Sequence, residues 1–267
     1  MARKGFSLIE LLVVIAVLSL LVSLVSASIR MGRQYSEALV CAGHLRQLSL
    51  AADIYTQNHD TLPYGFFDDT PEYPPGGPVG DNVYDWAGWW WFHFMYDSLG
   101  NPLESDSSIW CPSRFLLGSP SITRNALISN YGANFSLFKV NDPSPEADYE
   151  GTPIRPERLK QPAQTPLFLD SGYAWITWHG AKRDPSADFP MTKRIGSFYI
   201  PGLPVNGFRD INPDQLADAL NGRHLNHTIN VVFADGHTER EPVDTFIIED
   251  SETGLPCYSP LIWSSKY

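Results

Sequence analysis

The amino-terminal part of the chain carries an unbroken apolar segment. No residue from Leu11 to Ile29 is charged. As a helix, residues 6–29 would extend about 36 Å at about 1.5 Å per residue, whereas the apolar core of a bilayer is about 30 Å thick. The pattern therefore predicts a helix over 6–29 that can span a membrane.

A second hydrophobic pattern follows the first without a break. Every proline lies at Pro63 or later, so no proline interrupts a helix that continues to about Asn58. Such a helix would be about 80 Å long if straight. Its 30–60 part carries apolar residues at intervals of four, three, four and three, which places them on one helix face. These residues are Cys41, Leu45, Leu48, Ala52 and Tyr55. We expect this face to pack against the residues that follow.

The remainder of the chain, 61–267, has the pattern of a globular head. Pro166–Asp170 and Asn230–Gly236 each contain a short apolar run that ends in Asp before a turn residue, which predicts two buried strands. Ala234–His237 predicts a hairpin turn after the second strand. Residues 61–160 are rich in Gly and Pro and predict mostly loops. The predicted fold is therefore α+β: a long N-terminal helix packed on a head with an antiparallel sheet and long loops.

Charge and motif content exclude several classes of function. The formal net charge is -11, and a protein that binds nucleic acid usually draws its affinity from clustered Lys and Arg. No nucleophile elbow, phosphate-binding loop or dinucleotide fingerprint is present in the sequence. We therefore expect no nucleic-acid partner, no catalytic residue and no cofactor.

The apolar N-terminal segment has two simple interpretations. Arg3 and Lys4, followed by the apolar run and by small residues at Val25–Ala27, are typical of a cleaved secretory signal. An uncleaved membrane anchor is the other. Neither gives a purpose to Glu10, since an acid within a membrane helix costs about 3 kcal/mol on insertion scales.

The segment Gly5-Phe6-Ser7-Leu8-Ile9-Glu10 follows a short basic leader and precedes an apolar helix. It resembles the processing site of type IV pilins and of type II secretion pseudopilins. That resemblance implies cleavage between Gly5 and Phe6 by a prepilin peptidase on the cytoplasmic side, followed by N-methylation of Phe6. Residues 1–5 would then be a leader peptide, and Glu10 the fifth residue of the mature chain.

The same resemblance implies a role for Glu10 and a set of partners. Its carboxylate would pair with the Phe6 amine of a neighbouring subunit, so that Glu10 sets the register of stacked helices. The partners would be the peptidase, other pilin-like subunits in a homo- or hetero-oligomeric filament, and a secretion or pilus assembly machinery. The chain would be a single-pass protein of the inner membrane, with a cytoplasmic N-terminus and a periplasmic head, and could reach the cell surface after assembly.

The C-terminal part of the sequence adds a second motif. His224, followed by Asp235-Gly236, resembles a motif of prepilin-type proteins that is named for His, nine intervening residues and Asp-Gly (H-X9-DG). Ten residues separate His224 from Asp235 here, so the loop between them is longer by one. A metal or acid/base site is the alternative, and its candidate residues are His224, Asp170, Asp235, His227 and His237. Compact ligand spacing is absent, so we expect no metal and assign these residues to the turn and to hydrogen bonds.

The three cysteines suggest one disulfide and one free thiol in an exported chain. Cys41 lies near His44-Leu45-Arg46-Gln47-Leu48, which looks like the Asn-Leu-Arg-Gln-Leu stretch of a bacterial pseudopilin subfamily. The resemblance implies that Cys41 pairs with Cys111 and leaves Cys257 free. Pairing of Cys111 with Cys257 is the alternative.

Two functions from other classes compete with a filament subunit. A membrane-tethered carbohydrate-binding protein would use exposed aromatic rings as platforms. The candidate platforms are Trp89, Trp90, Trp91, Trp175 and Trp178. We expect most of these rings to be buried, which would exclude platforms. A secreted hydrolase would need a cleft with paired carboxylates.

Overall fold

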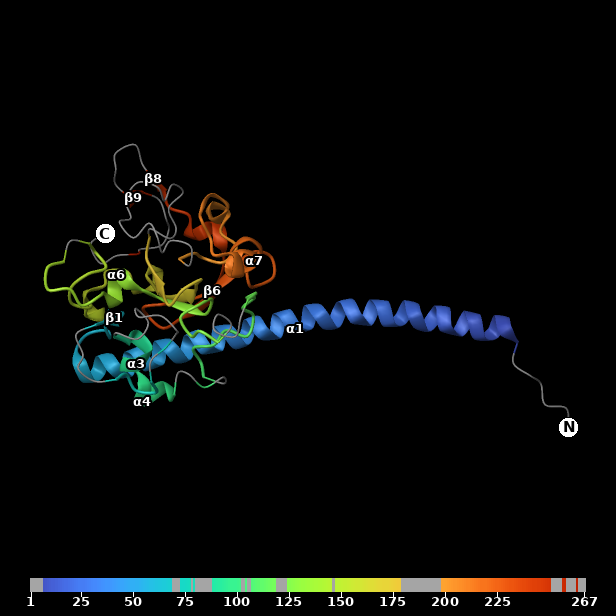
Figure 1. Ribbon diagram of the computed structural model, residues 1–267, viewed down its shortest axis with the longest axis horizontal. Helices are drawn as coiled ribbons and strands as arrows, with labels where there is room; N and C mark the ends of the chain where they lie inside the picture. Colours follow the sequence, from blue (N-terminus) through green and yellow to red (C-terminus); the bar gives the residue numbers. More distant parts are fainter. Residues whose placement is uncertain are drawn as a thin grey trace.

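A long helix, α1 (Leu8–His59), organises the molecule. The computed structural model describes residues 7–68, 73–77, 79, 88–101, 104, 107–118, 124–145, 147–178, 198–250, 256–257 and 263. In Figure 1, α1 extends from the head as a single rod, and only its C-terminal part lies against the head. The predicted long N-terminal helix and α+β head are confirmed.

Local signals at both ends of α1 account for its bounds. The Ser7 side chain accepts a hydrogen bond from the Glu10 amide, which caps the first turn. Asp60 adopts a left-handed conformation, with a φ of 62°, and its N–H donates to the carbonyl of Thr56. The helix therefore ends one residue beyond the predicted Asn58.

A five-stranded sheet with the order β5-β3-β4-β6-β7 forms the centre of the head. Its strands are β3 (Tyr131–Asn134), β4 (Pro166–Asp170), β5 (Trp175–Ile176), β6 (Thr228–Phe233) and β7 (Thr238–Pro242). Phe168 of β4 pairs with Val232 of β6, and Val232 pairs with Thr238 of β7, so these three strands are antiparallel. Both predicted strands and the hairpin are confirmed.

The sheet departs from the expected antiparallel pattern at one edge. After β4 the chain passes the end of β3 and returns as β5 on its far side, so that β5 runs parallel to β3. Gly132 allows this close passage, because a Cβ there would lie 2.7 Å from Cβ of Ser171 and 2.9 Å from the carbonyl oxygen of Tyr173. The sheet is therefore mixed.

Short elements complete the head. The helices are α3 (Trp91–Phe94), α4 (Tyr96–Leu99), α6 (Phe135–Phe138) and α7 (Leu216–Asn221). The 3-10 turns are η1 (Pro156–Arg158), η2 (Pro162–Gln164), η5 (Pro204–Phe208), η6 (Pro213–Gln215) and η7 (Val243–Phe246). Two small antiparallel pairs join β1 (Phe66–Phe67) to β2 (Trp89–Trp90) and β8 (Glu249–Asp250) to β9 (Pro256–Cys257). In the region where mainly loops were predicted, the described residues thus include short helices and strands.

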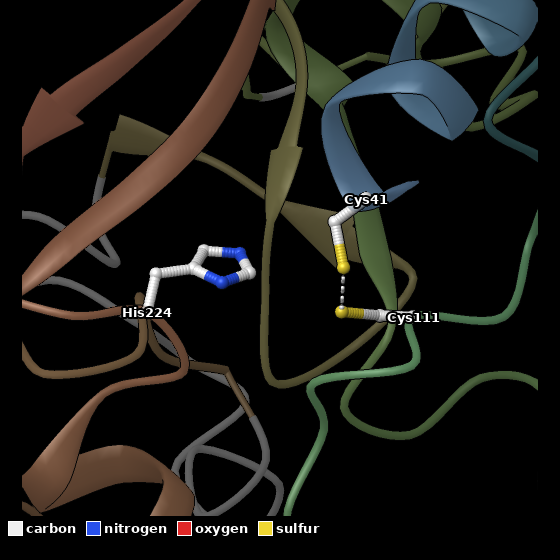
Figure 2. Close-up of side chains that lie close together, drawn as sticks. All are labelled: Cys41, Cys111 and His224. Carbon is white, nitrogen blue, oxygen red and sulfur yellow. Dashed lines mark hydrogen bonds between the residues drawn. The ribbon is translucent and has the colours of Figure 1, made fainter. Parts of the chain in front are cut away.

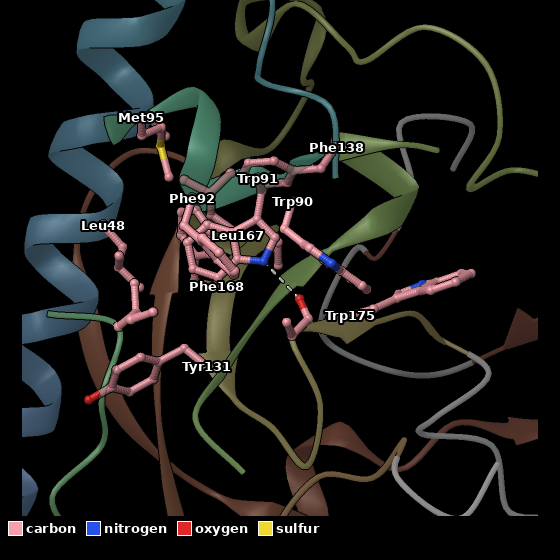
Figure 3. Close-up of a cluster of buried hydrophobic side chains, with 14 of the residues drawn as sticks. Leu48, Trp90, Trp91, Phe92, Met95, Tyr131, Phe138, Leu167, Phe168 and Trp175 are labelled. Atoms are coloured by element: carbon pink, nitrogen blue, oxygen red, sulfur yellow. Dashed lines mark hydrogen bonds between the residues drawn. The ribbon is translucent and has the colours of Figure 1, made fainter. Parts of the chain in front are cut away.

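The main core lies between α1 and the sheet. Cys41, Leu45, Leu48 and Ala52 are buried and Tyr55 is half-buried, as the stripe predicts. The stripe packs against a cluster of buried side chains that is rich in aromatic rings. In Figure 3, Leu48 and Met95 lie on the α1 side of this cluster, and Trp175 lies farther from α1. A second cluster covers the other face of the sheet with Leu169, Ile229, Val231 and Phe246, among others. Burial on both faces explains why β4 is apolar from Pro166 to Leu169.

Candidate functional site

Glu10 lies in the first turn of α1 and forms a capping box with Ser7. The Glu10 carboxylate accepts the Ser7 N–H at 2.8 Å, and Ser7 Oγ accepts the Glu10 N–H at 3.2 Å. Sequence reasoning gave Glu10 no partner within its own chain, although Ser7-x-x-Glu10 is a recognisable capping pattern. Gly5 and Phe6, the predicted processing residues, lie outside the described residues.

The part of α1 that precedes the head is apolar and uncovered. Its large side chains, from Leu8 to Val25, are all exposed. Among the described residues, α1 is the helix that is long and apolar enough to cross a membrane. Exposure of so many apolar groups is unfavourable in water, so this surface needs lipid or neighbouring helices around it.

His224, the first residue of the C-terminal motif, is buried between the sheet and α1. Its Nε2 lies 2.9 Å from Oδ2 of Asp170, the last residue of β4. The same carboxylate oxygen accepts the Asn230 N–H at 2.7 Å, and the Asn230 side chain donates to the Ala38 carbonyl at 3.0 Å. This set of contacts therefore connects β4, β6 and α1.

The electrostatics of this site favour a charged imidazole. Burial disfavours protonation of His224, but the charge of Asp170, its hydrogen bond and the neighbouring Cys41 raise the pKa of His224 to about 9. Burial also disfavours the ionised Asp170, yet His224 and Arg223 hold the pKa of its carboxyl below the usual range. His224 and Asp170 thus form a buried ion pair near neutral pH.

The adjacent Arg223 was not identified from the sequence as a site residue. Its guanidinium is fully buried, lies 2.9 Å from a carboxylate oxygen of Asp218, and donates to the Ser171 carbonyl at 2.5 Å. It also donates to the Asn130 carbonyl, and it lies 3.9 Å from Asp170. Asp218 lies five residues before Arg223, but the other two partners, Asn130 and Ser171, are 93 and 52 residues away, so the sequence around Arg223 does not show that it is buried.

Cys41 and Cys111 meet beside His224, as Figure 2 shows. The two Sγ atoms lie 2.7 Å apart as free thiols, and both residues are buried. A ring nitrogen of His224 and both sulfurs lie within 4.8 Å of one another. Burial alone would raise the pKa of Cys41, but the adjacent Cys111 thiol and the imidazole of His224 beside it lower that pKa to about 5. The predicted pairing stays a prediction, and the side chain of Cys257 lies outside the described residues.

The rest of the C-terminal motif has a different role. Asp235 and Gly236 form the turn between β6 and β7, where Gly236 has a φ of 87° and Asp235 pairs with His237. Within the described ranges, the five residues considered for a metal site contain no three that could share an ion. His224 and Asp235, which the sequence resemblance placed in one motif, thus lie at separate sites.

The tryptophan rings lie mainly inside the head. Trp90, Trp91 and Trp175 are buried, and Trp89 and Trp178 are half-buried. The Trp91 indole donates to the Ala174 carbonyl at 2.9 Å, so its polar edge is satisfied within the core. With three of the five rings buried, this set does not form a stacking platform.

A pH dependence follows from the buried ion pair. In a Cys41→Ser, Cys111→Ser variant, in which no thiol faces the ring, we expect the free energy of unfolding to fall by about 1–3 kcal/mol as the pH rises from about 6.5 towards 9. Asp170 still raises the folded pKa of His224 above its unfolded value, so the stabilisation is complete below about 6.5 and is lost as the pH passes the folded pKa. Urea titrations at several pH values measure this.

The control for this prediction is His224→Gln in the same background. The other charged groups at the site, Asp170 and Arg223, do not change state in this interval, so the Gln variant should lose the pH-dependent component. The same decline with and without His224 would assign it to other groups.

Comparison with known proteins places one segment of the chain. Residues 1–26 match the family model of the prokaryotic N-terminal methylation motif. No curated protein and no solved structure matches the chain. The matched motif, together with the long apolar helix, is consistent with a type IV pilin-like protein that is processed by a prepilin peptidase.

Proposed function

We propose that the chain is a structural subunit, a pseudopilin or minor pilin, of a type II secretion or type IV pilus-like filament. Prepilin peptidase cleaves it after Gly5 and methylates the amine of Phe6. The observation that carries this proposal is the methylation motif at residues 1–26, which includes the exposed apolar part of α1 from Leu8 to Val25. A subunit of this kind binds other subunits and carries out no chemistry itself.

The proposal assigns a place to each part of the chain. Residues 1–5 are the leader, 6–29 span the inner membrane, 30–60 carry the head, and 61–267 form the head in the periplasm. The N-terminus faces the cytoplasm, where the peptidase acts. On assembly, the apolar surface of α1 exchanges lipid for the helices of neighbouring subunits, which keeps it out of water.

Glu10 gives the filament its register in this proposal. Cleavage creates a positive amine at Phe6, and an unpaired charge in an apolar setting is costly until an opposite charge meets it. Because Glu10 already accepts the Ser7 N–H, its carboxylate is held at the helix terminus. A carboxylate has several lone pairs, so it can accept a neighbour's amine without losing that bond.

The mature N-terminus tests the proposal. We expect intact mass and N-terminal sequencing of the protein from a host with a prepilin peptidase to give N-methyl-Phe6. A Gly5→Val variant should keep its leader, because it changes the residue after which the peptidase cuts. A mature terminus at Ser28 would instead establish a secretory signal and contradict the proposal.

A further inference from the structure

We propose that Cys41 and Cys111 form a disulfide that ties α1 to the head, and that the adjacent residues Arg223 and His224 position the two cysteines for this bond. The proposal goes beyond the filament function, because it concerns how the head is fastened to its helix. It also selects one of the two pairings that the sequence left open.

The two sulfurs come from separate parts of the fold. Cys41 lies on the buried face of α1, and Cys111 lies 70 residues later in the segment 107–118. Both side chains are enclosed, and the Sγ–Sγ distance of 2.7 Å is shorter than non-bonded sulfur atoms normally adopt. The fold thus brings these two thiols within bonding reach.

A metal ion fits the same residues less well. Zinc binds cysteine sulfur at about 2.3 Å in a tetrahedron, which places two sulfurs on one ion about 3.8 Å apart. The observed 2.7 Å is much shorter. A structural zinc also takes four ligands, whereas the described residues supply Cys41, Cys111 and His224. We therefore favour the disulfide.

His224 and its neighbours fix the position of Cys41. Asp170 holds His224 at Nε2, while the buried Nδ1 has no hydrogen-bond partner among the described residues. Asn230, which shares the Asp170 carboxylate, donates to the carbonyl of Ala38, three residues before Cys41 on the same helix. These contacts set the rotation of α1, and with it the direction of the Cys41 side chain.

Arg223 fixes the other cysteine through one intermediate. Its guanidinium donates to the Asn130 carbonyl, and the Asn130 side chain accepts the Cys111 N–H at 3.0 Å. Arg223 thus positions Cys111 and its neighbour His224 positions Cys41. This arrangement explains why a histidine that does not contact the Asp235 turn is nevertheless buried next to α1.

The bond forms by thiol–disulfide exchange with a disulfide R–S–S–R, such as oxidised glutathione or an exported dithiol oxidase. The Cys41 thiolate attacks one sulfur of R–S–S–R and releases R–S⁻, which takes up the proton that Cys41 lost. Cys111 then loses its proton and attacks the Cys41 sulfur, which releases the second R–SH. Two cysteine sulfurs are oxidised, and one disulfide is reduced to two thiols.

Cys41 is the first of the two to react. The imidazole of His224, which Asp170 holds at Nε2, lies beside the Cys41 sulfur and favours its thiolate before Cys111 arrives. Because both sulfurs are buried in the finished fold, the exchange takes place before the segment 107–118 closes over α1. The intermediate is therefore a mixed disulfide on Cys41.

Peptide mapping tests the connectivity. The full chain is taken from the membrane of cells that export it, free thiols are alkylated, and the digest is analysed without reductant. We expect a linked Cys41–Cys111 peptide and an alkylated Cys257. A Cys111–Cys257 linkage, three alkylated cysteines, or a retained stoichiometric metal in native mass analysis would each overturn the proposal.

Refolding tests the positioning residues. The reduced chain is refolded from denaturant into detergent with oxidised and reduced glutathione, and the share of each linkage is measured. Wild type and His237→Ala, the control in which a half-exposed histidine outside the site is replaced, should give mainly the Cys41–Cys111 bond. His224→Ala should fall towards about one third, the share expected if three cysteines pair without preference.

Two further variants separate positioning from a general loss of folding. His224→Gln keeps a donor for Asp170 and should restore much of the native linkage. In Cys111→Ser the glutathione adduct should accumulate on Cys41, and His224→Ala should lower that adduct several-fold. A native linkage share in His224→Ala equal to that of wild type would refute the role of His224, as would an adduct independent of it.

Discussion

Replacement of Glu10 by leucine should leave membrane insertion intact and reduce incorporation into a filament by at least about tenfold. Insertion becomes easier, because an acid in a membrane helix costs about 3 kcal/mol on insertion scales. Incorporation fails because the Phe6 amine of the neighbouring subunit loses its partner. An uncompensated buried charge costs about 3–5 kcal/mol, and about 1.4 kcal/mol already corresponds to a tenfold change in association.

Membrane fractionation and electron microscopy of purified filaments measure these two outcomes separately. Glu10→Gln distinguishes charge pairing from helix capping, because Gln in the third position still completes the capping box with Ser7. If charge pairing sets the register, Gln fails to assemble as Leu does. Normal assembly of the Gln variant would show that capping is the only role of this residue. Normal assembly of the Leu variant would show that neither charge pairing nor capping by Glu10 is needed.

Replacement of Asp170 by alanine should destabilise the folded protein by about 3–5 kcal/mol. The change leaves His224 without its counter-ion, removes one carboxylate near Arg223, and leaves the Asn230 N–H without an acceptor. Unsatisfied buried charges and donors carry their full desolvation cost, so the loss exceeds that of a surface pair. Denaturant titration of the full chain in detergent gives the difference in free energy.

Asp235→Ala is the matched control for Asp170→Ala. Asp235 also pairs with a histidine, but in a half-exposed turn, where such pairs contribute about 0–1 kcal/mol. Asp170→Asn keeps an acceptor for the Asn230 N–H and should fall between the two. Equal losses in the two alanine variants would show that the buried pair has no special importance.

The N-terminal helix could be predicted because its signals are local. The apolar run, the stripe from Cys41 to Tyr55 and the position of the first proline each describe a few neighbouring residues, and together they located α1 to within two residues at each end. The β6–β7 hairpin was predicted for the same reason, since Asp235-Gly236 marks the turn between two strands. Periodicity and turn chemistry act over short distances, and a single sequence contains them fully.

The buried site could not be predicted in this way. Arg223 and Asp218 are five residues apart, but the other partners of Arg223, Asn130 and Ser171, lie 93 and 52 residues away, and no motif marks these contacts. The interpretation of His224 as part of a turn was incomplete, because ten residues separate it from a turn that it does not contact. The capping box of Ser7 and Glu10 has a local sequence pattern and could have been predicted, but the apolar run around Glu10 suggested a partner on another subunit instead.

The attachment of α1 to the head has a mechanical consequence. The head holds α1 over the stretch from Ala38 to Ala52, well before the chain leaves the helix at Asp60, and Asn230 of the central strand β6 binds the helix backbone directly. A pull along α1 is therefore shared in shear among many parallel contacts, while the covalent connection after His59 carries little load. In the filament that we propose, a force applied along the helices would therefore leave each head attached to its own helix.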